Sequence, residues 1–393
     1  MRLATLIAIF LTLAPVHASR AQTIPPKGTP TTFDVATWNT EWFGSSSNGP
    51  SDDALQFANV EATIAQSDID LWAVEEIADV NDFSQLLSDL GPGFDGTLAT
   101  NSGTQRIGFI YKRDVVHVRS VKHILEQFDF ATRPPLELEA DITVGDTTLT
   151  VTFIVVHMKA FNDISSYDRR VDGSQRIKNH IDFTTLANSR VMVMGDFNDE
   201  LLDSITPGQP SPYDNFLQDT DDYFFPTLSL EQAGIKTWIP GSGSNIDQIL
   251  ITNDLVPNYV INSVNTYIEL QSLFLPYTTT TSDHLPVYAR FDFARSTATE
   301  GGIELPTQPL LQTGYPNPFR TTTKIKYKLP GTVDAQLVVY NMLGRKVATL
   351  FEGTQTAGTH EAVFDASALP PGVFLIHLRT PSGEKTSVAL HVR

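Results

Sequence analysis

The sequence predicts an α/β domain over residues 32–293, followed by a small all-β sandwich domain over residues 313–393. Two observations predict this division. In the first region, short apolar runs alternate with longer amphipathic stretches, which indicates an α/β fold with at least one extensive sheet. In the second region, short alternating segments follow one another between Gly and Pro residues, a pattern typical of a β-sandwich.

Each element is placed from the spacing of its apolar residues. In the first domain the expected strands are 33–38, 71–74, 106–111, 151–156, 191–194, 246–251 and 287–293, and the expected helices are 52–66, 81–90 and 173–187. In the second domain the expected strands are 324–328, 336–340, 346–351, 359–364, 373–379 and 387–392.

The first residues have the three parts of a secretory signal peptide. Arg2 supplies the positive charge, residues 3–16 form an apolar run, and Ala18 or Ala21 would end the cleavage site. The run is shorter than the ~20 residues that a membrane-spanning helix needs. We therefore expect a signal peptide at residues 1–21 and no stable membrane insertion, with an ordinary buried helix as the alternative.

Two segments rich in Pro, Thr and Gly are expected to be linkers. Residues 22–31 (QTIPPKGTPT) would form a leader before the first domain, and residues 294–312 would join the two domains.

The composition excludes some kinds of chemistry. The chain has no cysteine, which excludes disulfides, thiolate nucleophiles and cysteine-ligated zinc. The formal net charge is −18, and the acidic excess lies in the first domain, because the segment from Glu300 onward has more basic than acidic residues. An acidic surface works against long-range attraction of nucleic acid, which binds mainly through Lys and Arg.

Six expected strands end or begin at polar or ionisable side chains. The motifs are TWNTEW at 37–42, DLWAVEEI at 70–77, VVHMK at 155–159, MGDFND at 194–199, NIDQIL at 245–250 and SDHLPV at 282–287. Polar groups at strand ends can converge on one edge of a sheet, where the sites of α/β proteins lie. Oxygen donors without cysteine suit a hard cation such as Mg²⁺ or Mn²⁺. Each motif alone is compatible with an ordinary turn, but the six together indicate an active site.

In their order, these motifs resemble those of the endonuclease/exonuclease/phosphatase superfamily, and within it the pancreatic-type deoxyribonucleases. The superfamily also includes abasic-site endonucleases, inositol-polyphosphate 5-phosphatases and bacterial sphingomyelinases. The resemblance covers residues 32–293 and implies a four-layer α/β/β/α sandwich, with two mixed sheets face to face. It implies a metal-dependent phosphoric ester hydrolase, in which a positioned water attacks phosphorus in line with the leaving group.

The resemblance implies a set of oxygen ligands for Mg²⁺ or Mn²⁺. Asn39 and Glu76 would hold the metal, with Glu41 and Asp283 as further or water-mediated ligands. Glu76 is preferred over Glu75, because the family places its ligand just before an aliphatic residue, here Ile77.

The resemblance also implies the residues that act on the phosphate. Asp196 would orient or deprotonate the attacking water, and Asn198 would bond a phosphate oxygen. His284, steered by Asp247, and His157 would contact the scissile phosphate as acid/base or charge-stabilising groups.

Two basic residues are implied as further phosphate contacts, namely Arg106 and Lys159. One departure from the family's pattern affects His157, the first histidine of the motif set. Pancreatic-type enzymes pair that histidine with a glutamate just before the position of Arg106, whereas Gln105 stands there in this chain. The orientation of His157 and its role as a general acid are therefore open.

The second domain has motifs of its own. YPNPF at 315–319, VVYNMLGRKVATL at 338–350, LPPGVFLIHL at 369–378 and a basic C-terminus resemble the sorting domain of the type IX secretion system. The resemblance implies a bacterial protein that engages the outer-membrane secretion machinery and reaches the cell surface or the medium. The alternative is a carbohydrate- or surface-binding β-sandwich, although this segment has no tryptophan.

Three substrate classes and one inactive alternative remain open. An extracellular nuclease is the first choice, although the acidic domain counts against tight duplex binding. A sphingomyelinase-like phospholipase would need an exposed apolar hairpin, for which residues 273–277 (LFLPY) are a candidate. An inositol-phosphate or phosphomonoester phosphatase would need further cations, which Lys159, Arg169 and Arg170 would supply. A catalytically inactive surface-binding module is the alternative of another class, against which the intact motif set argues.

Overall fold

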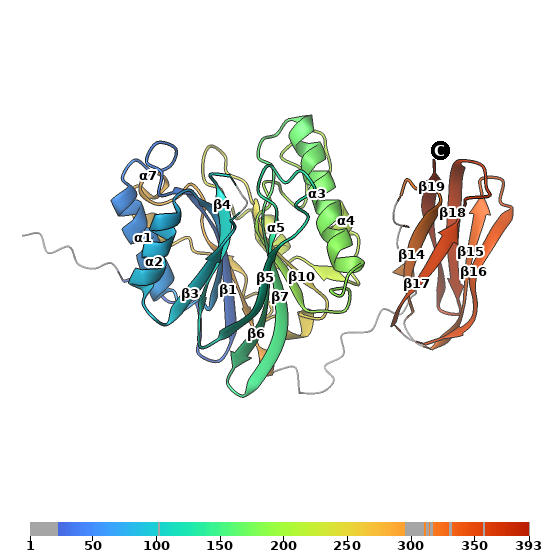
Figure 1. Ribbon diagram of the computed structural model, residues 1–393, viewed down its shortest axis with the longest axis horizontal. Coiled ribbons are helices and arrows are strands. Elements are labelled where there is room, and N and C mark those ends of the chain that lie inside the picture. Colours follow the sequence, from blue (N-terminus) through green and yellow to red (C-terminus); the bar gives the residue numbers. More distant parts are fainter. Residues whose placement is uncertain are drawn as a thin grey trace, which may run out of the picture.

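The computed structural model describes residues 23–100, 103–294, 310–311, 314, 317–329, 332–356 and 358–392 (Figure 1). The expected signal peptide at 1–21 lies outside the described residues, as does most of the expected linker at 294–312.

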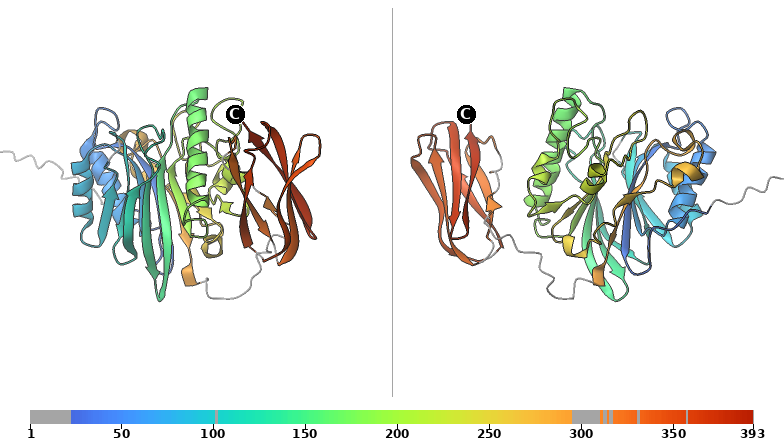
Figure 2. Two further views of the ribbon diagram at one scale, coloured as in Figure 1. Left: turned by 45° about the vertical axis from the view of Figure 1, so that its right-hand side comes forward. Right: turned by 180° about the vertical axis from the view of Figure 1, so that it is seen from behind.

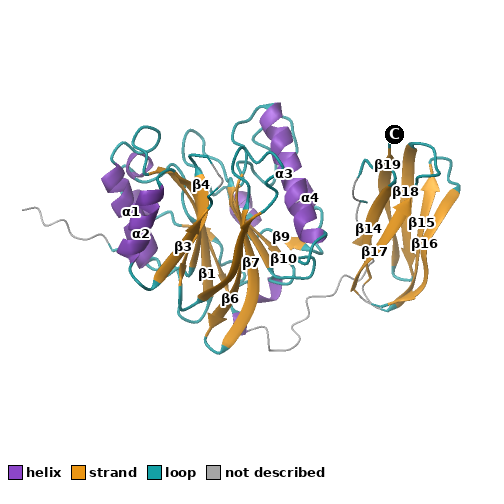
Figure 3. Ribbon diagram, in the orientation of Figure 1, coloured by secondary structure: helices purple, strands orange, loops and turns teal. Residues whose placement is uncertain are grey.

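Two six-stranded sheets pack face to face in the first domain (Figure 3). The first sheet has the order β11-β12-β1-β2-β4-β3, formed by β1 (Phe33–Phe43), β2 (Leu71–Ile77), β3 (Phe94–Leu98), β4 (Arg106–Lys112), β11 (Asn265–Thr266) and β12 (Val287–Phe291). The second has the order β5-β6-β7-β8-β10-β9, formed by β5 (Val116–His123), β6 (Leu136–Val144), β7 (Thr147–His157), β8 (Val191–Asp196), β9 (Tyr223–Phe224) and β10 (Asp247–Thr252). Both sheets are mixed, because each contains one parallel pair, β1 with β2 and β7 with β8.

Helices cover the outer faces of both sheets, and the blue helices α1 and α2 lie opposite the green helix α3 in Figure 2. The longer helices are α1 (Asp53–Gln66), α2 (Val80–Leu90) and α3 (Ile164–Asp182), and the short ones are α4 (Asp214–Leu217), α5 (Leu228–Gln232), α6 (Leu270–Leu273), α7 (Tyr277–Thr280) and the 3₁₀ turn η1 (Val256–Asn258). One hydrophobic core fills the space between the sheets, and another lies under each helical layer. The α/β/β/α prediction is thereby confirmed.

Side-chain alternation along β1 directs its polar end into the space between the sheets. Phe33 and Val35 belong to the central core, whereas Trp38 packs outward under the helices. Because alternate strand residues share a face, Thr37 and Asn39 continue the inward row beyond the apolar residues. The same strand thus supplies part of the core and, at its end, part of the polar cluster.

The structure corrects the bounds of the third expected helix. It begins at Ile164 and ends at Asp182, and not at residues 173 and 187. The carboxylate of Asp163 caps the first turn by accepting bonds from the amide of Ser166 (3.1 Å) and its hydroxyl (2.7 Å). The first two turns are largely polar, so their apolar spacing does not reveal them.

The described part of the expected leader is attached to the first domain. Ile24 is buried in a small core with residues of α6 and α7, and Lys27 forms an ion pair with Glu269 at 2.7 Å. The hydroxyl of Tyr267 donates to the carbonyl of Pro25. Residues 23–31 therefore pack as part of the domain surface.

The C-terminal region is a separate all-β sandwich, as expected. Its sheets have the orders β13-β14-β17 and β16-β15-β18-β19, formed by β13 (Leu310–Leu311), β14 (Thr322–Leu329), β15 (Val333–Asn341), β16 (Lys346–Gln355), β17 (Gly358–Asp365), β18 (Gly372–Thr380) and β19 (Gly383–His391). Phe319, the last residue of the YPNPF motif, is buried and stacks on His391 with ring centroids 5.2 Å apart. Within the described residues, no helix has the length and apolar character needed to cross a membrane.

Candidate active site

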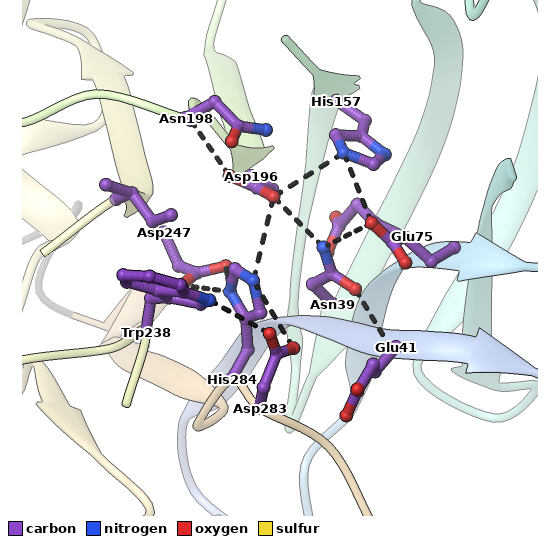
Figure 4. Close-up of polar contacts among 12 residues, drawn as sticks. Asn39, Glu41, Glu75, His157, Asp196, Asn198, Trp238, Asp247, Asp283 and His284 are labelled. Carbon is purple, nitrogen blue, oxygen red and sulfur yellow. Dashed lines mark hydrogen bonds and ion pairs between the residues drawn. The ribbon is translucent and has the colours of Figure 1, made fainter. Parts of the chain in front are cut away.

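Strand register brings the polar strand ends together at one edge of the two sheets (Figure 4). In the first sheet, Asn39 of β1 lies opposite Glu75 of β2. In the second sheet, Asp196 of β8 lies opposite both His157 of β7 and Asp247 of β10. Because the sheets pack face to face, these two rows form one buried cluster.

A local change of backbone direction brings Glu76 into this cluster. Adjacent strand residues normally point to opposite faces, but Glu76 has a φ of +61°. Its Oε1 accepts a bond from Asn39 Nδ2 (3.2 Å), and its Oε2 accepts one from the amide of Trp42 (3.2 Å). Glu75 and Glu76 therefore both face the cluster.

Asn39 connects the two sheets. Its Nδ2 also donates to Asp196 Oδ2 at 3.0 Å, and its Oδ1 accepts a bond from the amide of Glu41 at 3.0 Å. The carboxylate of Glu41 lies apart from Asn39 (Figure 4). Burial, and then repulsion from Asp283, raises the pKa of Glu41 to about 8.

Asp196 is buried at the centre of the cluster. Its Oδ1 accepts a bond from the amide of Asn198 at 2.8 Å. Burial raises the pKa of Asp196 to about 7, with His284 opposing the rise and Asp247 adding to it. The carboxyl group is therefore close to half-ionised near neutral pH, as suits a group that exchanges a proton there.

The backbone on either side of Asp196 has unusual conformations. Gly195 has a φ of +143°, and a Cβ atom there would lie 2.0 Å from the carbonyl oxygen of Val156, so only glycine fits. Asn198 has a φ of +54° and donates from Nδ2 to the carbonyl of Met158 at 3.1 Å. Such conformations gather at functional sites.

His284 and Asp247, which the sequence analysis places together, form a buried pair. Nδ1 of His284 lies 2.8 Å from Asp247 Oδ2, and Nε2 lies 4.0 Å from Asp196 Oδ2. Burial lowers the pKa of His284, but Asp247, Asp283 and Asp196 outweigh that effect and raise it well above 6.5. The imidazole is therefore a cation at neutral pH.

His157 has a different environment. Its Nε2 lies 3.5 Å from Asp196 Oδ2 and 3.6 Å from Glu76 Oε1, while its buried Nδ1 has no hydrogen-bond partner among the described residues. Gln105 does not orient it, because Gln105 Oε1 accepts a bond from Arg133 Nη1 at 2.7 Å.

Arg133 is a site residue that the sequence did not reveal. It is buried, and it donates from Nε to the carbonyl of His157 (3.4 Å) and from Nη2 to that of Met158 (3.2 Å). Burial, followed by the charge of Arg133 and then of His284, lowers the pKa of His157 well below 6.5. His157 is therefore neutral. Arg133 lies between β5 and β6 outside every motif, so no sequence signal marks it.

Trp238 was also missed by the sequence analysis. Its indole Nε1 donates to Asp283 Oδ2 at 2.9 Å, and its backbone forms a bridge with His284 (Figure 4). It therefore forms one wall beside the pair of His284 and Asp247. An aromatic residue followed by a Gly-rich turn was the available signal, but it fits a core residue equally well.

Glu75, which the resemblance did not choose as a metal ligand, is fully buried in the cluster. Its Oε1 accepts a bond from the Thr37 hydroxyl at 3.0 Å, and its buried Oε2 has no partner among the described residues. Burial, and then repulsion from Asp247 and Asp196, raises the pKa of Glu75 well above 4.5. Glu75 is therefore a neutral acid.

The different states of the two glutamates lead to a prediction. Glu75→Gln should keep kcat within a few-fold, because an amide has the shape and charge of the neutral acid. Glu76→Gln should instead raise the Mg²⁺ concentration needed for half-maximal activity by roughly 10-fold or more, because it removes a carboxylate charge from the proposed metal ligands. Metal titrations of both variants check this, and equal losses would contradict it.

Arg106 and Lys159, the two predicted phosphate contacts, bond or contact residues outside the buried cluster. Nη1 of Arg106 donates to the carbonyl of Ala78 at 3.1 Å. The Nζ atom of Lys159 lies 4.2 Å from the ring centroid of Phe161. Their contact with phosphate remains a prediction.

The donors of the cluster fit a hard divalent cation. All are oxygen or imidazole groups, and the buried Oε2 atom of Glu41 has no partner among the described residues. The raised pKa values of Glu41 and Asp196 indicate negative charge that the cluster itself does not compensate, and a divalent cation would compensate it. Asp196, Asp247 and His284 also lie close enough for a metal site, but the protonated Nδ1 of His284 is bound to Asp247.

Comparison with known proteins identifies both domains. The profile of the Endonuclease/Exonuclease/phosphatase family matches residues 36–284, and that of the Secretion system C-terminal sorting domain matches residues 313–390. The second match indicates export by type IX secretion to the cell surface or extracellular space. No curated protein sequence matches the chain.

The solved structures that this chain resembles are distant in sequence. The human nocturnin catalytic domain with bound sulfate is 17% identical, with 68% of this chain and 99% of that chain covered and a TM-score of 0.46. The complex of D. rerio TDP2 with a single-strand DNA product has 15% identity, coverages of 66% and 99% and a TM-score of 0.47. An AP endonuclease from Archaeoglobus fulgidus has 17% identity, coverages of 66% and 99% and a TM-score of 0.48.

The family match extends over most of the first domain, from the strand that carries Asn39 to His284 at the edge of the site. It does not single out the pancreatic type. Members of this family are phosphoesterases and typically depend on a divalent metal. The chain belongs to the endonuclease/exonuclease/phosphatase family.

Proposed function

We propose that the protein is an extracellular nuclease that hydrolyses phosphodiester bonds with the help of Mg²⁺ or Mn²⁺. The observation that carries the proposal is the position of Asp196 between a cationic and a neutral histidine. Its Oδ2 lies 3.5 Å from His157 Nε2 and 4.0 Å from His284 Nε2. An acid–base group beside two imidazoles suits attack by water on a phosphodiester.

The first part of the proposed mechanism concerns the attacking water. A divalent cation held by Asn39 and Glu76, with Glu41 and Asp283 nearby, would neutralise charge on the phosphate oxygens. Asp196, with a pKa of about 7, orients the water and accepts its proton. The side-chain amide of Asn198 donates to a phosphate oxygen.

The second part concerns the charge that develops on the phosphate. His284, held as a cation by Asp247, stabilises that charge and can return a proton to the leaving oxygen. His157 is neutral and has no carboxylate on Nδ1, so it donates a hydrogen bond from Nε2 rather than a proton. With Gln105 bonded to Arg133, we propose this role for His157 in place of a general acid.

The phospholipase alternative loses its supporting feature. Phe274 and Tyr277 of the candidate hairpin are buried in a core, and Leu275, which is 75% exposed, is its one exposed large apolar residue. One exposed leucine does not make a membrane-inserting hairpin.

The phosphatase alternative loses one of its cations. Arg170 is fully buried and bonded to Asp199, so it is not available to a substrate. An inactive binding module would not need a buried ionisable cluster with left-handed backbone at Glu76 and Asn198. The C-terminal domain is proposed to engage the outer-membrane secretion machinery.

An assay of the purified chain tests the proposed function. Plasmid DNA, RNA, sphingomyelin and a phosphomonoester are each incubated with Mg²⁺, Mn²⁺ or EDTA. We expect metal-dependent nicking of DNA or cleavage of RNA that EDTA abolishes. Turnover of sphingomyelin or of the monoester alone would be consistent with the proposed hydrolytic mechanism but would reject the proposal that the protein is a nuclease. No turnover in either metal would support the binding module.

A further inference from the structure

The loop that follows β7, the strand that ends at His157, holds an aromatic ring in solvent. Phe161 is four residues beyond His157, and its side chain is 69% exposed. Its φ of +80° is rare for a residue that is not glycine. An apolar ring exposed on a strained backbone contributes nothing to the core, so its position calls for a functional reason.

A buried arginine fixes the backbone of this loop. Nη1 of Arg170 donates to the carbonyls of Lys159 (2.8 Å) and Phe161 (2.7 Å). Its Nε donates to Asp199 Oδ2 at 2.8 Å, and Nη2 to the Thr206 hydroxyl at 3.0 Å. A fully buried guanidinium with four such partners holds the strained turn in one conformation.

The other end of the loop is tied to the site itself. The carbonyl of Met158 accepts bonds from Asn198 Nδ2 (3.1 Å) and Arg133 Nη2 (3.2 Å). Four residues of chain reach at most about 14 Å. The ring of Phe161 therefore lies within reach of the nucleotide next to a phosphate held by His157.

Two arginines lie near Lys159, and one of them, Arg169, forms an ion pair with Asp129 at 2.5 Å. The Nζ atom of Lys159 lies 4.2 Å from the centroid of the Phe161 ring. Burial, followed by repulsion from Arg169 and Arg133, lowers the pKa of Lys159, while Asp163 opposes that effect. The two arginines therefore add positive potential beside Lys159, while burial of the lysine is the larger cause of its lowered pKa.

We propose that Phe161 and Lys159 bind the base and the phosphate of the nucleotide adjoining the cleaved bond, so that the preferred substrate is single-stranded nucleic acid. This rests on the proposed nuclease function. An exposed ring can stack only on a base that is not paired and stacked within a duplex, and every base has a face to offer. The phosphate of the same nucleotide then meets Lys159.

The surroundings favour a nucleotide over a lipid surface. The next exposed apolar residue, Ile164, borders a hollow that is also lined by Asp129, Asp168 and Asp172. Arg169 lines the same hollow, so the surface around Ile164 is charged rather than apolar. Phe161 is therefore an isolated stacking surface rather than part of an apolar patch for membrane insertion.

Three substitutions at one exposed position test the proposal in the full chain. Phe161→Ala removes the ring, Phe161→Leu keeps apolar bulk without a flat face, and Phe161→Trp keeps stacking. The substrates are a single-stranded DNA oligomer and the same oligomer with base-less residues flanking the cleaved bond. We expect Phe161→Ala and Phe161→Leu to raise KM for the normal oligomer roughly 5- to 100-fold with little change in kcat. Phe161→Trp should behave like the parent protein.

The base-less oligomer provides the specific readout. The parent protein and Phe161→Ala should have the same KM for it, because no base is present to stack. Equal KM values for the normal oligomer, in a parent protein that cleaves it, would overturn the base-binding site and leave the nuclease intact. The base-binding site would also be overturned if Phe161→Ala lost binding to anionic vesicles while its KM for the DNA oligomer stayed unchanged. A parent protein that cleaves no nucleic acid would instead reject the proposed function. Equal Tm values of the four proteins exclude a folding defect.

Discussion

His284→Ala should lower kcat on a phosphodiester by roughly 10³-fold, with a much smaller change in KM. The reason is the charge on this imidazole, which lies between Asp247 and Asp196 and carries a raised pKa. A cation in that position interacts more strongly with the transition state than with the substrate. The measurement is kcat and KM at pH 7 with saturating Mg²⁺.

Two further variants separate charge from shape at this position. Asp247→Asn keeps the shape beside Nδ1 but removes the charge that keeps His284 protonated, so it should lose nearly as much activity. His157→Ala should lose less, on the order of 10²-fold, because the neutral His157 supplies only a hydrogen bond. A larger loss for His157→Ala than for His284→Ala would reverse the assigned roles.

The metal-free protein should lose thermal stability as the pH rises from about 6.5 to about 8.5. The pKa values of Glu41, about 8, and Asp196, about 7, lie above those of the unfolded chain. The folded state thus holds more protons in this range, and the stability contributed by the protonated groups is lost as the pH rises. His157, with its lowered pKa, acts in the opposite direction only below about 6.5. The Tm from pH-dependent calorimetry in EDTA measures the effect.

Divalent metal should reverse this loss. Saturating Mg²⁺ competes with protons for the carboxylates, so it should raise Tm more at about pH 8.5 than at about pH 6.5. Glu41→Gln is the matched control, since removing one carboxylate should flatten the pH dependence of the metal-free protein. A Tm that is constant or that rises with pH in EDTA would mean that the cluster carries no uncompensated charge.

The site residues at the strand ends could be predicted from the sequence, because two local rules combine there. Apolar runs mark strands, and the polar residue that closes a run lies at the sheet edge. Asn39, His157 and Asp196 follow these rules and lie within one cluster. The order of the six motifs then led to the family, which the profile match confirms.

Other features depended on contacts between distant segments. Arg133 stands in no motif, and it reaches the site because its guanidinium is within bonding distance of the carbonyls of His157 and Met158. The inward direction of Glu76 depends on a left-handed residue that strand alternation does not predict. The polar first turns of α3 are helical because Asp163 caps them and Arg170 bonds the preceding loop.

By itself, the sequence determined the α/β class, the all-β tail and the family, because these depend on apolar spacing and on the order of short motifs along the chain. The tertiary structure alone decided which histidine is charged. His157 ends a strand and His284 precedes one, but Asp247 reaches Nδ1 of His284 across the space between the sheets, whereas Arg133 lies beside His157. Protonation depends on burial and on charges from distant segments, so only the packed fold sets it.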